Sequence, residues 1–365
     1  MNKLKETIFW LIYRPISWYK SFRLWYKIIF HAHNKSGIQV SLPFHIKILY
    51  NLRGFTDLQY LLFDLKHNNY KDYISTWERF RLENVNGRFA FFLGEKVMFE
   101  RMFGKFVNVP HIHCWVKCGK IINLDDNETE ISIIKEIQKE GAFIAKPTRS
   151  LGGGKKIHEL TYADHSFYID GKELSVDDFV KECRKLEDYI FTKKISSHEY
   201  SKKIYPYSSN TIRVITTMDN TANEVDVLLA FHRFGTKRSK FVDNISSGGV
   251  FALVDVETGK LGAAKSIFDL DDLAKTYITH PDTGAPIKDV IIPKWQELLA
   301  NLKHAHKCFA YYRFFAWDIT LDEDGKPWVL EINRGSDLSV QVLSPLRHAK
   351  LGDWMSKQGL LKLYR

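Results

Sequence analysis

Residues 317–334 have the sequence WDITLDEDGKPWVLEINR, and they say most about the fold. Two short apolar runs flank a charged segment with a Gly and a Pro, a pattern that predicts a β-hairpin. Asp318 lies on the first strand, and Glu331 and Asn333 lie two residues apart on the second, so we expect all three side chains on one face. Their oxygens form the kind of site that Mg²⁺ prefers, although a surface hairpin is the more common outcome for such a stretch alone.

A second informative stretch is FIAKPTRSLGGGKK at 143–156. Lys146 stands at the end of a predicted strand, six residues before three glycines, Gly152, Gly153 and Gly154. Glycines let backbone N–H groups approach an anion, and the lysine supplies positive charge, so the stretch predicts a phosphate-binding loop. Its spacing is not that of a Walker loop, and by itself it would also fit a hairpin turn.

Length and composition set the class of protein. A chain of 365 residues with 45% hydrophobic and 26% charged residues is long enough for two or three globular domains. The formal net charge of +10 indicates an anionic partner, such as a nucleotide, an acidic glycan or a membrane surface. The positive charge is dispersed and no recognition motif occurs, so we expect no nucleic-acid binding.

The four cysteines and the lack of a secretion signal predict a reducing, cytoplasmic location. Cys114 and Cys118 lie near His111 and His113, which could indicate a metal site. The run HIHCWV at 111–116 alternates as a strand does, however, so we favour a structural role for these residues.

The first thirty residues mix tryptophans and phenylalanines with lysines and arginines. No apolar run approaches the roughly twenty residues of a membrane span, and no cleavable signal peptide is evident. Two interpretations stay open for residues 1–30. They form helices docked on the core, which is the usual place of aromatic stripes, or an amphipathic segment lying peripherally on the inner face of an anionic membrane.

Hydrophobic periodicity predicts a helical N-terminal region, 1–88, followed by a change towards short strands at Phe89. In the rest of the chain, helices are predicted at 128–140, 174–186 and 294–310. Strands are predicted at 143–146, 189–192, 211–217, 225–231 and 250–256. Because many strands lack a helical crossover, we expect an α+β fold with largely antiparallel sheets.

Taken together, the lysine with its glycine-rich loop and the acidic hairpin resemble the ATP-grasp superfamily, in which two α+β lobes clasp ATP. In that family a strand-borne Asp is followed, about a dozen residues later, by Glu-x-Asn, and these residues bind Mg²⁺. Asp318, Glu331 and Asn333 match that pattern. The resemblance implies an ATP-grasp domain at 89–365, with a small nucleotide lobe at about 128–195 and a metal-binding lobe at about 196–355.

The resemblance also implies which residues bind ATP. Lys96, which follows Gly94 and Glu95, is similar to the family's first nucleotide lysine at the start of a helix, and it would approach the phosphates together with Lys146. The run YIFTK at 189–193 resembles the strand that lines adenine. Lys193 stands where the family commonly has a Glu, so backbone groups would hold the base.

Further motifs resemble the subgroup called sugar-transfer-associated ATP-grasp, often found with cell-surface polysaccharide biosynthesis. They are SNTIRVIT at 209–216, DNISSGGV at 243–250, HPDTG at 280–284, IPKW at 292–295 and WD at 317–318. Within them, a loop rich in small polar residues would close over a polar substrate, or form a plain hairpin loop. Its candidate substrate residues are Asn244, Ser246, Ser247, Gly248 and Gly249, joined by His232 and Arg233 at a strand end.

The resemblance implies that ATP transfers its γ-phosphoryl group to a carboxylate, which an amine then attacks. Arg213 has the planar fork suited to the transferring group, and Arg334 would do the same or clamp the acceptor. Many relatives carry an Arg two residues before the metal-binding Asp, but here that residue is Ala316. A surface ion pair is the alternative for either arginine.

We therefore expect a ligase that forms a C–N amide bond between an amino acid and a sugar acid or amino sugar, in capsule or other surface-polysaccharide synthesis. One alternative is a kinase that uses the same fold to phosphorylate a small molecule. The other is a non-catalytic subunit associated with a glycan or a membrane. The oligomeric state stays open.

Overall fold

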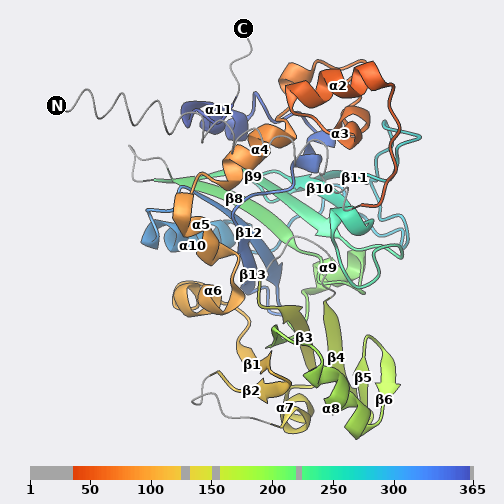
Figure 1. Ribbon diagram of the computed structural model, residues 1–365, viewed down its shortest axis with the longest axis vertical. Coiled ribbons are helices and arrows are strands. Elements are labelled where there is room, and N and C mark those ends of the chain that lie inside the picture. The colour runs from red at the N-terminus through yellow and green to blue at the C-terminus, as the bar shows by residue number, and fades with distance from the viewer. Residues whose placement is uncertain (1–35, 125–131, 150–156, 219–223, 362–365) are drawn as a thin grey trace, which may run out of the picture.

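The structure is a computed structural model that describes residues 36–124, 132–149, 157–218 and 224–361. It contains two sheets, one at the lower end of an elongated molecule and one in its middle, with α2, α3 and α11 at the upper end (Figure 1). One sheet has seven strands in the order β2-β1-β7-β3-β4-β5-β6, and the other has six in the order β11-β10-β9-β8-β12-β13. All pairings between these strands are antiparallel, which confirms the predicted α+β class.

The seven-stranded sheet has one face packed against helices α7 (Ile133–Glu140) and α8 (Val176–Arg184). Its strands are β1 (Ile112–Lys117), β2 (Lys120–Ile122), β3 (Ala142–Pro147), β4 (His158–Ala163), β5 (Ser166–Ile169), β6 (Lys172–Leu174) and β7 (Tyr189–Lys193). Side chains alternate across these strands, and every second residue of β1 is buried. This alternation confirms the strand interpretation of 111–116, and the sheet begins ahead of the predicted lobe boundary at 128.

The six-stranded sheet is covered on both faces. Its strands are β8 (Ile212–Met218), β9 (Val225–Phe234), β10 (Val250–Val254), β11 (Leu261–Lys265), β12 (Phe314–Leu321) and β13 (Pro327–Asn333). Helices α6 (Lys96–Phe103) and α10 (Trp295–Cys308) pack on one face. Helices α3 (Asp57–Leu62), α4 (Thr76–Glu83) and α11 (Lys350–Lys357) pack on the other. The whole of β12 is buried because it lies between these two layers.

The remaining elements are short. They are α2 (Phe44–Arg53), α5 (Ala90–Leu93), α9 (Glu199–Ile204) and the 3₁₀ turns η1 (Tyr70–Asp72), η2 (Gly87–Phe89), η3 (Ile245–Ser247) and η4 (Leu338–Val342). The helices and strands predicted after residue 128 are confirmed, with ends displaced by a few residues. Residues 1–30 and the glycines at 152–154 lie outside the described residues.

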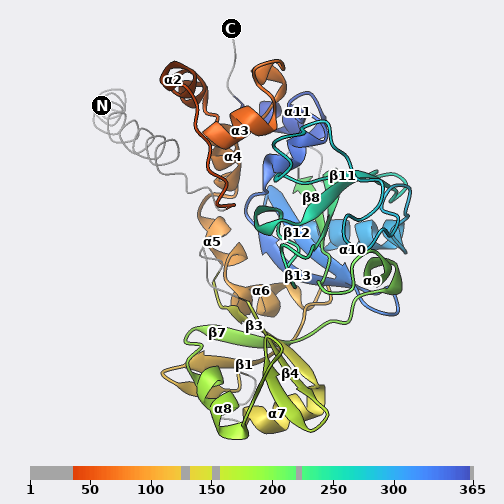
Figure 2. The same cartoon turned by 90° about the vertical axis from the view of Figure 1, so that its right-hand side faces the viewer.

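The helices of the N-terminal region continue past residue 88, and the expected change to short strands at Phe89 does not occur there; α6 begins at Lys96, as the family resemblance implied. α5 and α6 follow, because Phe99 and Phe103 lie one helical turn apart and both enter the core beneath α10. The region is also tied to the C-terminal part. Buried Glu78 on α4 pairs with Arg347, just before α11, at 3.0 Å. α4 and α11 accordingly lie at the same end of the molecule (Figure 2).

Within the described residues, no helix is both long and apolar enough to cross a membrane.

Candidate active site

The acidic hairpin forms as predicted, with one irregularity. Asp318 on β12 lies opposite Glu331 on β13, but the next pair is Ile319 with Val329, so Leu330 is the extra residue of a β-bulge. The bulge changes which side chains share a face. Val329 and Ile332 are three residues apart, yet both enter the same core cluster, which an uninterrupted strand would not allow.

The bulge leaves the three predicted ligands in contact. The Asn333 amide donates hydrogen bonds to Asp318 Oδ2 at 3.2 Å and to Glu331 Oε1 at 2.9 Å. Asp318 is buried, with 4% of its surface exposed, whereas Glu331 and Asn333 are half-buried. The three side chains therefore share a face, and their polar atoms meet at one edge of that face.

Two arginines from neighbouring strands hold the Asp318 carboxylate. Arg213 on β8 lies opposite Asp318 and binds both its oxygens, at 2.5 and 2.7 Å. Arg233 on β9 reaches Oδ1 at 3.1 Å. Burial acts to raise the pKa of Asp318, but the two guanidinium groups outweigh it and hold that pKa at about 2. Asp318 is therefore a fully ionised carboxylate at neutral pH.

The donors of this site meet the requirements of Mg²⁺ only after one side-chain rotation. Asp318 has about four acceptor positions. All are taken, two by Arg213, one by Arg233 and one by the Asn333 amide nitrogen. Turning the Asn333 amide over would free one position and add an amide oxygen beside the two carboxylates. With that rotation the donors fit a hard cation. No group of three or more His, Cys, Asp or Glu suited to a metal occurs in the described residues, and here the third donor is an Asn.

Two lysines, Lys146 and Lys96, lie close to the acidic hairpin. Lys146, on β3 of the seven-stranded sheet, donates to the Leu330 carbonyl in the bulge at 3.4 Å. Burial and the neighbouring Lys96 lower the pKa of Lys146 to about 8, and Glu331 acts in the opposite sense. Burial also lowers the pKa of Lys96, and Glu331 again opposes it. Glu331 thus lies within electrostatic reach of both predicted phosphate lysines.

Lys193 does not join them. Its side chain, 54% exposed, pairs at 2.9 Å with Glu140 at the end of α7. Lys193 follows Phe191 by two residues, and Phe191 packs with the core under α7 and α8, which is the opposite face from Lys146. On the Lys146 face, β7 presents the side chains of Ile190 and Thr192, and the assignment of 189–193 to the adenine stays a prediction.

The predicted substrate loop is anchored by Asp243, a residue that pattern alone did not single out. Its Oδ2 accepts from the Thr211 backbone N–H at 2.6 Å and hydroxyl at 2.5 Å. Arg233 lies 3.7 Å away and also bonds the Thr211 hydroxyl. Burial acts to lower the pKa of Arg233, but Asp243, Asp318 and Glu331 together raise it. The loop is thereby connected to the carboxylate site.

Members of the loop itself differ in their surroundings. Asn244 is exposed, and Ser246 and Ser247 are half-buried, so these three can meet a ligand. Gly248 and Gly249 are buried. A Cβ at Gly248 would lie 2.6 Å from Arg238, and one at Gly249 would lie 2.6 Å from a backbone carbonyl. The two glycines therefore serve close packing.

His232 and Arg233 do not face the same side, contrary to expectation. They are neighbours on a strand, so they point to opposite faces. The His232 Nε2 lies 2.8 Å from the Tyr200 hydroxyl, and the ring stacks on Phe234 in the core beneath α10. Burial lowers the pKa of His232 to about 3, so it is neutral. Arg233 alone belongs to the site.

Ala316 and Arg334, the two remaining positions singled out in the sequence, lie in different surroundings. Ala316 is fully buried in the core on the Asp318 face, where it leaves room for no charged group. Arg334 is exposed immediately beyond β13. Ser336 follows two residues later, and its hydroxyl oxygen accepts a hydrogen bond from Arg213 Nη1 at 3.4 Å. Pattern did not predict Ser336, because a lone serine after a strand carries no distinguishing signal.

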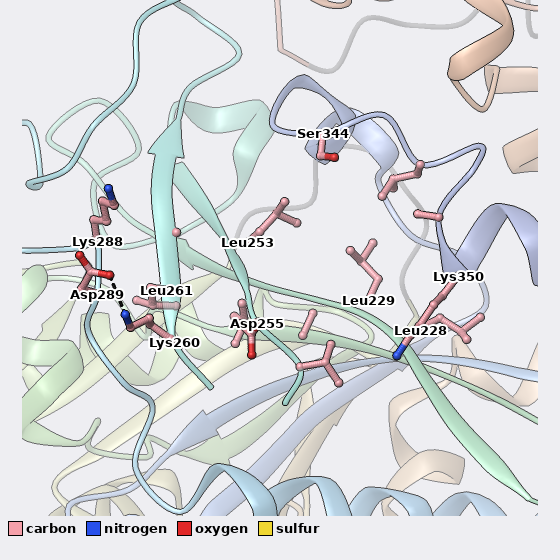
Figure 3. Close-up of a pocket in the computed structure, with 16 residues that line it drawn as sticks. Leu228, Leu229, Leu253, Asp255, Lys260, Leu261, Lys288, Asp289, Ser344 and Lys350 are labelled. Atoms are coloured by element: carbon pink, nitrogen blue, oxygen red, sulfur yellow. Dashed lines mark ion pairs between the residues drawn. The ribbon is translucent and has the colours of Figure 1, made fainter. Parts of the chain in front are cut away.

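A separate cavity of about 490 Å³ lies elsewhere on the six-stranded sheet (Figure 3). Leu228, Leu229 and Leu253 form part of its wall, and lysines such as Lys260 and Lys350 stand around it. Its lining comes from the ends of β9 and β10 remote from Arg233, and it contains none of the predicted site residues. The cavity is thus distinct from the carboxylate site.

Comparisons with known proteins were made for the whole chain. The family described as "Sugar-transfer associated ATP-grasp" matches residues 76–349. No curated protein matches the sequence. Among solved structures, ATP-grasp ligase PsnB with minimal precursor, Mg and ADP is 13% identical with a TM-score of 0.36, over 75% of this chain and 61% of that one.

Two other solved structures give similar values. The ADP complex of purK, N5-carboxyaminoimidazole ribonucleotide synthetase, is 12% identical with a TM-score of 0.39, over 71% of this chain and 52% of that one. The L-amino acid ligase from Bacillus licheniformis is 11% identical with a TM-score of 0.36, over 73% and 43%. The chain spans less than two thirds of each of these structures. The family match covers most of the chain and includes the hairpin, both arginines and both lysines, and so this chain belongs to the sugar-transfer associated ATP-grasp family.

Proposed function

We propose that this protein is a ligase that uses ATP and Mg²⁺ to join a carboxylate to an amine through an acyl phosphate. The observation that carries the proposal is the placement of Glu331. Its carboxylate lies near Lys96, Lys146 and Arg233, which come from different elements of the fold; it opposes the lowering of the pKa values of the two lysines by burial and helps to raise the pKa of Arg233. Carboxylates set among several cations suit a polyphosphate bound together with a divalent ion.

In this proposal the chain's own residues position and neutralise charge, which is most of what phosphoryl transfer requires. Asp318, Glu331 and Asn333 would hold Mg²⁺, whose contribution is to neutralise phosphate charge as the γ-phosphoryl group is transferred. Lys96 and Lys146 would bind the phosphates. The glycines at 152–154 keep their predicted role in the phosphate loop.

Arg213 would fix the orientation of Asp318, because its Nε and Nη2 are both bonded to that carboxylate. Its Nη1 has only a 3.4 Å contact with Ser336, so this nitrogen would keep the capacity to donate to the transferring group. Arg334, exposed beside Asn333, would clamp the acceptor. The polar residues Asn244, Ser246 and Ser247 would contact the substrate.

For the substrates, we propose an amino acid and a sugar acid or amino sugar of a cell-surface polysaccharide or capsule precursor, met in the cytoplasm. The family's description, sugar-transfer associated, supports a glycan precursor. Exposed polar side chains on the 244–249 loop suit a ligand rich in hydroxyl groups.

The test is release of ADP in a screen that pairs amino acids with uronic acids and amino sugars. A ligase releases ADP and phosphate only when both partners are present, and mass spectrometry finds an amide. A phosphorylated product without an amine would show a kinase. Mg²⁺-dependent ATP binding is measured first, with Glu331→Gln as the matched variant. Failure of the wild-type chain to bind ATP would favour a non-catalytic subunit, a role also compatible with the saturated Asp318 carboxylate.

A further inference from the structure

The helix α2 presents apolar side chains to solvent. Phe44, Ile48 and Leu49 are 77%, 39% and 42% exposed. These three positions span about 140° of the helix circumference, and Leu52, which is 56% exposed, lies between Ile48 and Leu49, so the four side chains form one apolar face, which we call the α2 stripe. Isolated exposed apolar residues are common, but a group of this size on one helix face marks an interaction site.

The other side of α2 fixes the direction of the stripe. Tyr50 lies there, and its hydroxyl donates to the Leu65 carbonyl at 2.8 Å. The Tyr50 ring also packs edge-on against Tyr60 of α3, with centroids 4.7 Å apart. Gly54, with φ of 96°, ends the helix in a left-handed cap. The α2 stripe is therefore held outward by contacts on the opposite side of the helix.

The sequence around α2 is strongly basic. The first 53 residues contain nine Lys and Arg and a single Glu, so they hold +8 of the net charge of +10. No Asp or Glu occurs from residue 7 to residue 56. On α2 itself, Lys47 forms a 3.0 Å ion pair with Asp57 and Arg53 lies over the rings of Tyr50 and Tyr70, so most of this positive charge belongs to the sequence that precedes α2. The charge of this sequence favours an anionic partner, and the exposed apolar face favours one that accepts apolar side chains.

We propose that the α2 stripe docks on the surface of an anionic lipid bilayer. Basic residues beside an exposed apolar helix face are the features that bind such surfaces. The acid-free stretch also contains Trp10, Trp18 and Trp25, and tryptophan favours the membrane interface. α2 lies at the end of the molecule opposite the seven-stranded sheet (Figure 1), so docking there leaves the nucleotide lobe away from the bilayer.

The first experiment is co-sedimentation of the full chain with phosphatidylcholine vesicles that contain or lack phosphatidylglycerol. We expect binding only to the anionic vesicles, weakening as salt is added. The variant Phe44→Ser/Ile48→Ser/Leu49→Ser should bind at least about tenfold more weakly, one decade in the binding constant. The matched control is Val176→Ser/Ile278→Ser/Ile291→Ser, which removes three apolar residues that are 49%, 61% and 58% exposed elsewhere. Circular dichroism verifies that both variants fold.

The second experiment reports directly on the helix. Phe44→Cys, in a chain whose exposed Cys118 and Cys308 are changed to Ser, is labelled with an environment-sensitive fluorophore. A blue shift only on addition of anionic vesicles supports the proposal. A blue shift without vesicles would mean that another part of the chain or a second copy covers the α2 stripe, and it would overturn the proposal. So would equal vesicle binding by the wild-type chain and the stripe variant.

Discussion

The two carboxylates of the hairpin lie opposite each other, yet their surroundings differ. Asp318 is buried and bonded to two arginines and an amide, whereas Glu331 is half-buried, bonds Asn333 and faces two lysines. The Asp318 side satisfies its charges within the protein. On the Glu331 side, burial depresses the pKa values of Lys96 and Lys146, so a bound anion would stabilise their charged forms. The difference shows that the Asp318 half of the site stabilises the fold, whereas the Glu331 half is free to bind a ligand.

The largest expected effect is on activity. Glu331→Ala should reduce ADP release about a thousandfold, because losing metal-assisted charge neutralisation costs several kcal/mol of transition-state stabilisation. Steady-state assays at saturating ATP and Mg²⁺ measure it. Glu323→Ala, which removes an exposed carboxylate from the turn of the same hairpin, is the control and should retain wild-type activity. Equal losses in both variants would disprove a special role for Glu331.

The next largest effect is on the free energy of unfolding, which should fall more when Asp318 is removed than when Glu331 is removed. Asp318→Ala should lower the free energy of unfolding by about 3–5 kcal/mol, because two buried guanidinium groups lose their partner. Glu331→Ala should lower it by about 1 kcal/mol or less, since one amide hydrogen bond is lost. Urea denaturation measures both. Similar losses in the two variants would contradict the comparison.

The pKa of Asp318 also predicts how the free energy of unfolding depends on pH. Its pKa is about 2 in the folded protein against an ordinary value of 3.8. Its contribution is therefore complete above about pH 4 and is lost as pH falls through 2.

A smaller effect concerns Lys146. With a pKa of about 8 in the free protein, its ammonium group loses its proton as pH rises from 7 to 9. Anionic phosphate favours the charged form, so the Kd for ATP should rise by about tenfold over that interval. Calorimetric titration at several pH values measures it. Lys146→Met should bind ATP more weakly at pH 7 and have a flatter pH profile, and an unchanged slope would assign the titration to another group.

The smallest effect is expected at Lys193. Its side chain pairs with Glu140 on the helix-covered face, so Lys193→Ala should leave the Kd for ATP within about twofold, as is usual for an exposed ion pair. Calorimetric titration against wild type gives the comparison. A loss as large as that of Lys146→Met would mean that the side chain turns towards the nucleotide when ATP binds.

Much of the fold follows from local pattern. Alternation and helical spacing predicted the main strands and helices after residue 128, because burial on one face leaves a direct period in the sequence. Local pattern did not predict α6, because the composition after Phe89 indicated short strands; only the family resemblance placed the start of a helix at Lys96. The two phenylalanines that make α6 a helix are recognisable only with the core they enter. Local pattern also failed to separate His232 from Arg233, since alternation does not say which face bears the site.

The sequence by itself determined the identity and spacing of the donors: Asp318, then Glu331 and Asn333, with Lys146 ahead of three glycines. It also determined the acid-free N-terminal stretch. Tertiary structure decided the rest. The bulge at Leu330 restores the shared face, and pairing of β12 with β8 brings Arg213 onto Asp318. The other sheet supplies Lys146 to the bulge. These contacts join residues far apart in the chain, and only the packed sheets select them from the many that composition allows.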